Sequence, residues 1–432
     1  MSRLRFSTSL PHPRRMFHGW WIVVGTWAMQ ALQGSLFFLS FGAYADQLQA
    51  HFGWSRTSIS GAFALARVES GLLGPLQGWS VDRFGPMLNI RVGVVLFGVG
   101  FMLMSAIQTL WHFYAAFLLL AVGASLAGFL TLNTSVANWF IRKRAMAMGI
   151  AQTGLGLGGG ALVIVVAWML QAFGWRATFL IAGIAILAIG LPLSSLFVHR
   201  PEDRGQLPDG AAKEERAVGA GGGARLAEDD FLLREAVRDP SFWFISIGHG
   251  AALLVVSSIQ VHLVLHLRDL GWSLTSAASL VTALTLTSTL GQLGGGFLGD
   301  RYSKRMLAAA CMLGHALGML ALAYATAPTV IVAAALLHGL AWGTRGPLMT
   351  AIRADYYGRR NFAKVMGVSS LVVQLGTVTG PLLAGFLFDQ TGSYQLPFVI
   401  LGAATGVSAV FFLLARPPRR RSPRPAPAAP GA

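Results

Sequence analysis

The sequence has few charged residues for its length. Asp, Glu, Lys and Arg make up 12% of its 432 residues, whereas 54% are hydrophobic. A soluble domain usually carries about 25% charged residues. A deficit of this size, with apolar runs along the whole chain, excludes most soluble proteins and predicts an integral membrane protein.

Cysteine is nearly absent as well, because Cys311 is the only one. A disulfide within the chain and a cysteine-based metal site are therefore excluded. The sequence also lacks a cluster of metal ligands, a nucleotide-phosphate loop and a nucleophile–base motif. A GxGxxG string runs from Gly154 to Gly159, but it lies in an apolar run with no strand before it, which favours close helix packing. We expect no metal, no cofactor and no enzymatic activity.

Long apolar runs are what the sequence has instead. A bilayer core is about 30 Å thick, and a helix needs roughly 20 mostly apolar residues to cross it. Twelve runs have this character: 17–40, 57–79, 88–108, 111–133, 145–170, 175–198, 241–266, 274–298, 305–326, 328–350, 363–388 and 394–415. The sequence therefore predicts an all-α membrane protein with twelve transmembrane helices.

Positive charge is in excess, with a formal net charge of +16. Nearly all Lys and Arg fall in segments that lie on one side of the twelve-span topology, and the other side holds only Arg56, Arg176 and Arg268. Positive residues concentrate on the cytoplasmic side of membrane proteins. The distribution predicts a cell inner-membrane protein with both termini in the cytoplasm, and it explains the charge without a nucleic-acid partner.

The sequence repeats itself. Gly53-Trp54-Ser55 aligns with Gly271-Trp272-Ser273, and the GxxxDR string Gly78, Asp82, Arg83 aligns with Gly296, Asp300, Arg301 at the same offset of 218 residues. At that offset Gly149, Gly158 and Gly174 also align with Gly367, Gly376 and Gly392. Each repeat holds six spans, an even number, so the two halves have the same orientation in the membrane. Parallel six-helix repeats are a known architecture of transporters.

These patterns predict five segments. They are an N-terminal cytoplasmic tail, 1–16; a first six-helix half, 17–198; a cytoplasmic connector, 199–240; a second six-helix half, 241–415; and a disordered cytoplasmic tail, 416–432. The connector is rich in Ala and Gly at 217–224, a composition that buries too little apolar surface to order itself fully. A short amphipathic helix is expected near 229–238.

The loop after the second span carries a family resemblance. Gly78-Trp-Ser-Val-Asp82-Arg83-Phe-Gly85 resembles the signature loop of the major facilitator superfamily, and a weaker copy follows at Gly296–Arg305. The resemblance implies that the residues Gly78, Asp82, Arg83, Gly296, Asp300 and Arg301 govern switching between conformational states. A physical reason is available, since an Asp can cap a helix N-terminus while the Arg anchors a cytoplasmic loop.

Two further strings narrow the resemblance. The segment from Trp139 to Gly154 is similar to the start of span five in the monocarboxylate-transporter-like branch, and His18-Gly19-Trp20-Trp21 is similar to the start of span one there and in oxalate/formate antiporters. Two features differ from that branch. The acidic residue of its span-one motif is missing, and span eight (274–298) lacks the Arg that those families keep.

Three ionisable groups stand inside the predicted spans: Arg67, Glu69 and Arg345. A charge at the bilayer centre is costly, so such residues are functional by default. A guanidinium matches a carboxylate bidentately, and we expect Arg345 to bind the anionic group of a substrate; a structural ion pair or a gate is the alternative. Desolvation disfavours the charged form of a carboxyl group, which would suit Glu69 to carry a coupling proton. The alternative is a structural role, as a hydrogen bond between packed helices or as the partner of a buried Arg.

Weaker candidates complete the site. His249 in span seven titrates near neutral pH when unperturbed, although a lone buried His is more often a packing residue. Polar side chains expected to line a central cavity with Arg345 and Arg67, or else to bond neighbouring helices, are Gln30, Gln33, Asn133, Gln152 and Gln374.

The sequence as a whole predicts a monomeric secondary transporter. Its expected partners are the lipid bilayer, a small-molecule substrate and a coupling proton or counter-anion. The two intramembrane arginines against one glutamate favour a small organic anion, and the family resemblance specifies a monocarboxylate. Import of a larger neutral or weakly charged metabolite such as a vitamin, and efflux of neutral or anionic compounds, stay open.

Overall fold

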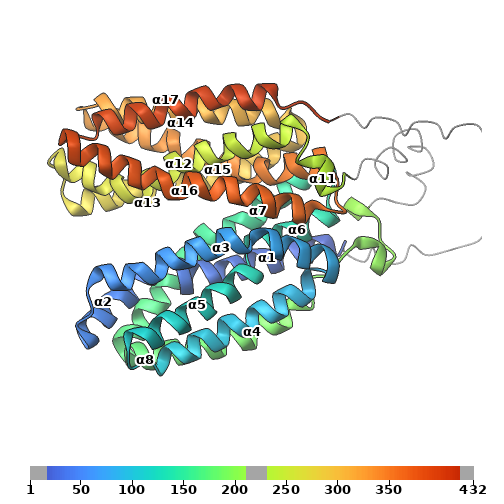
Figure 1. Cartoon of the computed structure of the whole chain (residues 1–432), viewed down its shortest axis with the longest axis horizontal. Helices are drawn as coiled ribbons and strands as arrows, with labels where there is room; N and C mark the ends of the chain where they lie inside the picture. The colour runs from blue at the N-terminus through green and yellow to red at the C-terminus, as the bar shows by residue number, and fades with distance from the viewer. Residues whose placement is uncertain (1–16, 211–230, 419–432) are drawn as a thin grey trace, which may run out of the picture.

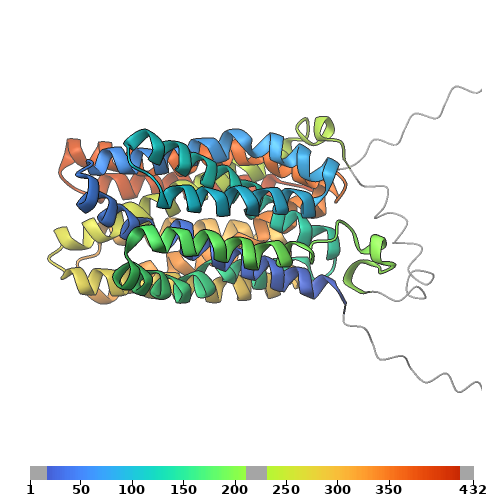
Figure 2. The ribbon, with the colours of Figure 1, turned by 90° about the horizontal axis from the view of Figure 1, so that it is seen from below.

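The computed structural model describes residues 17–210 and 231–418. The predicted tail 1–16, the Ala- and Gly-rich part of the connector and most of the tail 416–432 lie outside these ranges. Within them, long helices run side by side along one direction and group into two bundles (Figures 1 and 2).

The first bundle contains the helices from Gly19 to Ser194. They are α1 (Gly19–Gln33), the π-helix η1 (Gly34–Leu39), α2 (Phe41–Phe52), α3 (Arg56–Phe84), α4 (Pro86–Ser105), α5 (Leu110–Leu126), α6 (Phe129–Trp139), α7 (Arg144–Thr153), the π-helix η2 (Gly154–Gly158) and α8 (Gly159–Ser194). Helix α8 turns sharply at Gly174, where φ is 74° and ψ is 171°, and so supplies the end of one predicted span and the whole of the next. Phe97, Phe101 and Phe179 lie in the apolar core of this bundle.

The second bundle contains α12 (Pro240–Asp269), α13 (Leu274–Arg301), α14 (Lys304–Tyr324), α15 (Pro328–Tyr357), α16 (Phe362–Thr391) and α17 (Gln395–Leu414). Leu263, Met319 and Phe398 belong to its core. Between the bundles, the described connector forms two short 3₁₀ helices, η3 (Pro201–Arg204) and η4 (Pro208–Gly210), and a single-turn helix α11 (Leu233–Ala236), which falls within the amphipathic helix expected near 229–238.

The twelve-helix fold is confirmed. Eight helical stretches among the described residues are long and apolar enough to cross a membrane, and one of them, Arg144–Ser194, holds two spans. The remaining three long helices are α3, α13 and α15. Helices α3 and α13 each carry a GxxxDR string, α13 also has many Ser and Thr, and α15 carries Arg345. Polar residues on these three helices keep their mean hydropathy low, which is typical of helices that face a protein interior.

The repeat found in the sequence has a structural basis at the start of α3 and of α13. Gly53 and Gly271 both have positive φ, 70° and 84°, a conformation that only glycine adopts readily. Ser55 and Ser273 follow as helix N-caps, and their side chains accept a hydrogen bond from the backbone N–H of Ser58 and Ser276. The same turn-and-cap therefore starts α3 and α13.

Both bundles end beside the connector. The segment from Val198 to Gly210 (green in Figures 1 and 2) lies at one end of the helices, and Gly210 lies close to Phe17 there. The chain leaves α17 at the same end (Figure 1), and the start of α12 lies beside it, since the Ser241 hydroxyl donates to the carbonyl of Arg416. We call this the connector end and the opposite one the far end.

Candidate functional site

Two helix pairs hold the bundles together toward the connector end. Helix α3 packs against α16, next to it in Figure 1, and α7 packs against α13. Both crossings depend on glycine: a Cβ atom at Gly78 would overlap the backbone carbonyl of Ala363, and one at Gly296 would lie 2.8 Å from the carbonyl oxygen of Ala145. Small residues allow such close backbone approach in membranes. The aligned glycines Gly149 and Gly367 complete the two crossings from the opposite side.

The two aligned aspartates cap helices of the opposite bundle. Asp82 accepts hydrogen bonds from the backbone N–H groups of Ala363 (3.3 Å) and Lys364 (3.1 Å), in the first turn of α16. Asp300 accepts from the N–H groups of Ala145 (2.8 Å) and Met146 (3.0 Å), in the first turn of α7. A carboxylate is favourable at a helix N-terminus. We call the first contact, with Gly78, the first latch and the second, with Gly296, the second latch.

The arginines next to these aspartates do not join the latches. Arg83 is exposed and lies over the rings of Trp79 and Phe84, at 5.6 Å from each centroid. Arg301 lies 3.4 Å from the ring centroid of Phe297. Each arginine packs against aromatic residues close in sequence, as expected for a side chain that anchors the end of its own helix.

Closure of the latches buries their carboxyl groups at the connector end, beyond the predicted spans. Burial raises the pKa of Asp82 to about 7, against the opposing effect of the two N–H groups and of Lys364. Burial likewise raises the pKa of Asp300. The latches therefore contain carboxyl groups that take up protons more readily when the bundles are together.

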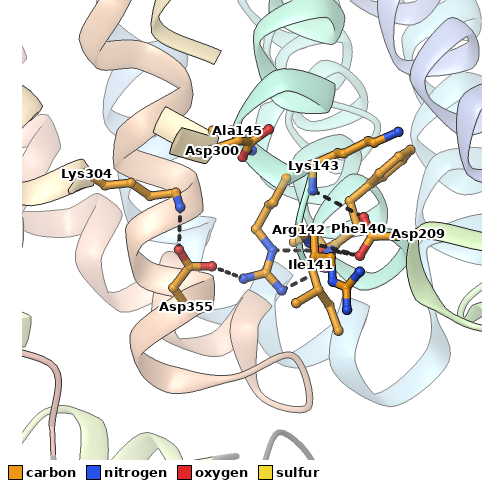
Figure 3. A network of polar contacts seen from close by, with 11 residues as sticks. Phe140, Ile141, Arg142, Lys143, Ala145, Asp209, Asp300, Lys304 and Asp355 are labelled. Atoms are coloured by element: carbon orange, nitrogen blue, oxygen red, sulfur yellow. Dashed lines mark hydrogen bonds and ion pairs between the residues drawn. The ribbon is translucent and has the colours of Figure 1, made fainter. Parts of the chain in front are cut away.

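A polar network next to the second latch joins both bundles and the connector (Figure 3). The buried guanidinium of Arg144 forms an ion pair with Asp355 of α15, whose other oxygen lies 2.8 Å from Lys304. On the other side of the α6–α7 loop, the carboxylate of Asp209 in the connector accepts hydrogen bonds from the backbone N–H groups of Ile141, Arg142 and Lys143, at 3.1, 2.9 and 3.2 Å. The loop between α6 and α7 is thus held from two directions.

Polar residues also meet at the middle of the bundles. The Gln152 side chain donates to Oδ1 of Asn133 (3.3 Å) and, across the boundary, a Cβ atom at Gly346 of α15 would lie 2.8 Å from Oε1 of Gln152. Gln374 of α16 donates to the backbone carbonyl of Arg67 (3.3 Å). Four of the predicted site residues therefore take part in hydrogen bonds here, and one of these bonds, from Gln374 to Arg67, crosses from one bundle to the other.

The predicted fourth span is interrupted. Helix α5 ends at Leu126 and α6 begins at Phe129, which leaves carbonyl groups without helical partners. Gln33 donates to the carbonyl of Ala127 (2.9 Å), and Gln77 donates to that of Ser125. Gln33 therefore has a structural partner, whereas Nε2 of Gln30, one turn earlier and 6% exposed, has none among the described residues.

Glu69 lies beside the same interruption. Its Oε2 accepts a hydrogen bond from the Ser125 hydroxyl (3.1 Å), and its Oε1 is buried with no hydrogen-bond partner in the described part of the chain. Arg67, two residues away, lies elsewhere, 5.1 Å from the ring centroid of Phe38. The two charged residues of α3 thus have different surroundings, as their spacing of about 200° around the helix requires.

Arg345 is buried inside the second bundle. It is 1% exposed, and among residues 17–210 and 231–418 no hydrogen bond reaches its Nε or Nη1. Arg353, two turns further along α15, is also 1% exposed, and its guanidinium donates to the Ser369 hydroxyl (2.8 Å) and lies 3.3 Å from Nδ1 of His249. The structure brings the predicted residues Arg345 and His249 into one electropositive cluster.

Two members of these networks were not among the site residues predicted from the sequence. Arg144 and Arg353 were counted with the positive residues of the cytoplasmic side, but their exposed fractions are 3% and 1%. Arg353 was placed outside its span because the apolar run fades near residue 350, whereas α15 continues to Tyr357. Its i+8 spacing from Arg345 was the available signal, since residues at this spacing share one helix face.

Comparisons with known proteins agree with this architecture. The sequence profile described as "Major Facilitator Superfamily" matches residues 26–278 and 246–431. Monocarboxylate transporter 13 of Bos taurus is 27% identical over 391 residues, covering 89% of this chain and 86% of that protein. The oxalate:formate antiporter of Oxalobacter formigenes is 28% identical over 225 residues, covering 51% and 50%.

Solved structures show the same fold. The human organic anion transporter MFSD10 superimposes with a TM-score of 0.70 at 14% identity, covering 93% of this chain and 100% of that one. The proton:xylose symporter XylE superimposes with a TM-score of 0.72 at 16% identity, covering 92% and 95%.

The fold and the matches define a class, the membrane-embedded secondary transporters of small molecules. The chain belongs to the major facilitator superfamily, and its curated relatives include monocarboxylate transporters and the oxalate:formate antiporter. Members of this family are transporters and not enzymes, as the sequence predicts.

Proposed function

We propose that this protein moves a small organic anion, a monocarboxylate, across the cell inner membrane by alternating access. The observation that carries the proposal is Arg345, a guanidinium that is 1% exposed and has no carboxylate partner in the described part of the chain. A buried, uncompensated positive charge is costly, and an anionic substrate compensates it. The similarity to monocarboxylate transporters and to an oxalate:formate antiporter supports the same substrate class.

The connector end is the cytoplasmic side in this proposal, since positive residues concentrate there. Both latches and the Arg144–Asp355 ion pair are at that end. The conformation is then an outward-facing one with its cytoplasmic gate closed, and transport requires the two bundles to rock and the latches to separate.

Proton coupling is proposed for Glu69, because its Oε1 is a buried carboxyl oxygen with no partner among the described residues. Arg67, Gln30, Asn133, Gln152 and Gln374 are proposed to line the substrate path, and His249 to assist the proton. The protein acts as a monomer in this scheme, and each six-helix half is one moving body.

Uptake into proteoliposomes tests the proposal. Labelled lactate, pyruvate, oxalate, formate and an aromatic acid are supplied with and without an inward proton gradient. Wild-type protein is expected to accumulate one of these acids faster with the gradient, and Arg345→Gln to lower uptake roughly 10- to 100-fold, the range for loss of a charge-assisted hydrogen bond. Arg234→Gln, at an exposed residue of the connector, is the matched control.

Two outcomes decide the proposal. Absence of uptake for every acid under both conditions overturns it and directs the search to neutral metabolites and efflux. Uptake by Glu69→Gln that keeps its full dependence on the proton gradient removes Glu69 from the coupling step and leaves anion transport intact.

A further inference from the structure

A pair of histidines lies next to Arg345 in the interior of the second bundle. His315 of α14 and His338 of α15 are both fully buried, with 0% exposure. Their Nδ1 atoms are 3.1 Å apart and their ring centroids 4.6 Å apart. His338 and Arg345 are seven residues apart and share one face of α15, and a helical side chain leans toward the helix N-terminus, so the guanidinium extends toward His338.

The hydrogen bond fixes the protonation pattern of the pair. Between two neutral imidazoles, one ring donates its Nδ1–H and the other accepts at Nδ1. The donor ring then has a lone pair on Nε2, and the acceptor ring carries its hydrogen there. Both Nε2 atoms are buried and have no hydrogen-bond partner among the described residues. The pair thus has one basic nitrogen ready for a proton and one N–H ready for an acceptor.

Among residues 17–210 and 231–418, nothing acidic compensates the charge around this cluster. The groups that interact with it electrostatically are Cys311 on α14, His249 on α12, and Arg345 and Arg353 on α15. The packed helix α17 contains no titratable residue, and α13 and α16 carry theirs only near their ends, at Asp300, Arg301, Lys364 and Asp389. A bare guanidinium in this setting opposes protonation of the histidines, so a proton and an anion stabilise the site only together.

We propose that Arg345, His315 and His338 form one buried site that takes up a carboxylate or another small monovalent anion together with a proton. The anion lies against the free Nε and Nη1 of Arg345, and the proton binds the basic Nε2 of the histidine pair to give one imidazolium. No bond to carbon changes, and the bound pair adds no net charge. The inference rests on the proposed anion transport and adds the histidine pair to it as a proton acceptor. No carboxylate of the described chain lies within hydrogen-bonding distance of this pair.

Binding of the two ligands is then reciprocal. An anion at Arg345 removes the repulsion that a proton meets at the histidines, and a proton at the histidines strengthens anion binding by the same factor. Symport requires this linkage. Because Arg345 and both histidines belong to the second bundle, both ligands would move with that bundle as it rocks.

The test uses purified full-length protein in detergent and measures two quantities. Thermal unfolding midpoints are recorded with sodium chloride, formate, lactate or oxalate at equal ionic strength, since a ligand of the native state raises the midpoint. Proton uptake on addition of each anion is followed with a pH dye in weak buffer near neutral pH. The wild type is expected to show a higher midpoint and uptake of about one proton per bound anion, a stoichiometry that follows from the shared site.

Three variants separate the roles. Arg345→Gln should lose the stabilisation by anions, with affinity lowered roughly 10- to 100-fold, and Arg345→Lys should retain part of it. The double variant His315→Asn, His338→Asn removes both titratable Nε2 atoms, so proton uptake should be lost, and anion affinity should fall because each ligand strengthens binding of the other. His112→Asn, at an exposed histidine of the first bundle, is the matched control.

Each outcome decides one question. Unchanged proton uptake in the double histidine variant, or unchanged stabilisation in Arg345→Gln, overturns the site even when acids are transported. Stabilisation by chloride or formate that depends on Arg345, without transport of any acid, upholds the site and overturns the proposed substrate. Stabilisation by none of the anions overturns the site.

Discussion

At the scale of single residues, the two latch aspartates show how a short motif acts through distant partners. Asp82 and Asp300 each accept two backbone N–H groups from a helix that begins more than 150 residues away in the sequence. The sequence predicts residues that cap a helix, because Asp is favourable there. Which helix is capped depends on the approach of the two bundles.

We predict that the two latches make closure of the connector end sensitive to pH. Burial raises the pKa of Asp82 to about 7 in the closed state, whereas an Asp in water has a pKa of about 3.9. The closed state therefore binds more protons between about pH 4 and 7, so acidification through this window favours closure. Above about pH 7 both states are ionised and the dependence should vanish.

Spin labels on Lys143→Cys and Tyr302→Cys, in a Cys311→Ala background, report the separation of the bundles at the connector end. The closed population should rise from pH 8 to pH 5. The double variant Asp82→Asn, Asp300→Asn should lose this rise, and a rise of unchanged size in the double variant would contradict the linkage.

Gln30 and Gln33 offer a second test at the residue scale. Gln33 supplies the carbonyl of Ala127 with its hydrogen bond, and Gln30 has an amide nitrogen without a partner in the described chain. Gln33→Leu should lower stability by about 1–3 kcal/mol, the cost of a buried polar group left unsatisfied. Gln30→Leu should leave the unfolding midpoint unchanged and reduce substrate affinity. Thermal unfolding and the uptake KM measure the two effects, and equal losses of stability would contradict the distinction.

At the scale of helices, the crossing of α3 and α16 depends on the absence of a side chain at Gly78. A methyl group there would overlap the backbone carbonyl of Ala363, which cannot move without separating the helices. Gly78→Ala should destabilise the closed state by about 1–3 kcal/mol, the usual effect of overpacking. This would shift the equilibrium roughly 5- to 150-fold toward the open state.

The spin-label pair described above measures that shift. Gly160→Ala is the matched control, because a Cβ at Gly160 meets nothing within 4 Å. An unchanged distance distribution in Gly78→Ala, or an equal shift in Gly160→Ala, would show that the crossing does not set the gate.

The interruption of the fourth span also belongs to this scale. Helix α6 begins at Phe129, after the cap residue Gly128. The backbone carbonyls at the break accept hydrogen bonds from Gln33 of α1 and Gln77 of α3. The run 111–133 was continuously apolar enough to predict one helix. Hydropathy reports burial in the membrane and carries no information on where a backbone hydrogen bond is replaced by a side chain.

At the scale of the whole molecule, the connector that links the two halves is attached to both bundles near the second latch. Asp209 has φ of 59°, which is uncommon for a residue other than glycine, and its carboxylate accepts hydrogen bonds from three backbone N–H groups of the α6–α7 loop. Arg359 of the second bundle donates to Glu202 of the same segment at 3.3 Å.

Removal of the Asp209 carboxylate should loosen this attachment. Asp209→Gly suits the positive φ but leaves the loop uncapped, at a cost of about 0.5–2 kcal/mol by analogy with helix caps. Faster tryptic cleavage after Arg204 in native protein is the expected result. Asp209→Asn, which retains one acceptor oxygen, should be intermediate, and cleavage of Asp209→Gly at the wild-type rate would contradict the role of the carboxylate.

The sequence alone determines the twelve helices, the duplication and the family. Each of these depends on local properties that repeat along the chain: apolar length, the turn at Gly53 and Gly271, and the spacing of Gly78 and Asp82. The residue types of the site were also available, since a buried charge such as Arg345 or Glu69 is conspicuous in an apolar span.

Only the tertiary structure decided which groups meet. Asp82 with α16, Arg144 with Asp355, and His315 with His338 are contacts between helices whose separation in sequence bears no relation to their distance in space. Arg353 stayed unnoticed because the end of an apolar run is not the end of a helix. Partner choice is set by how two packed bundles approach, and a one-dimensional pattern does not record that approach.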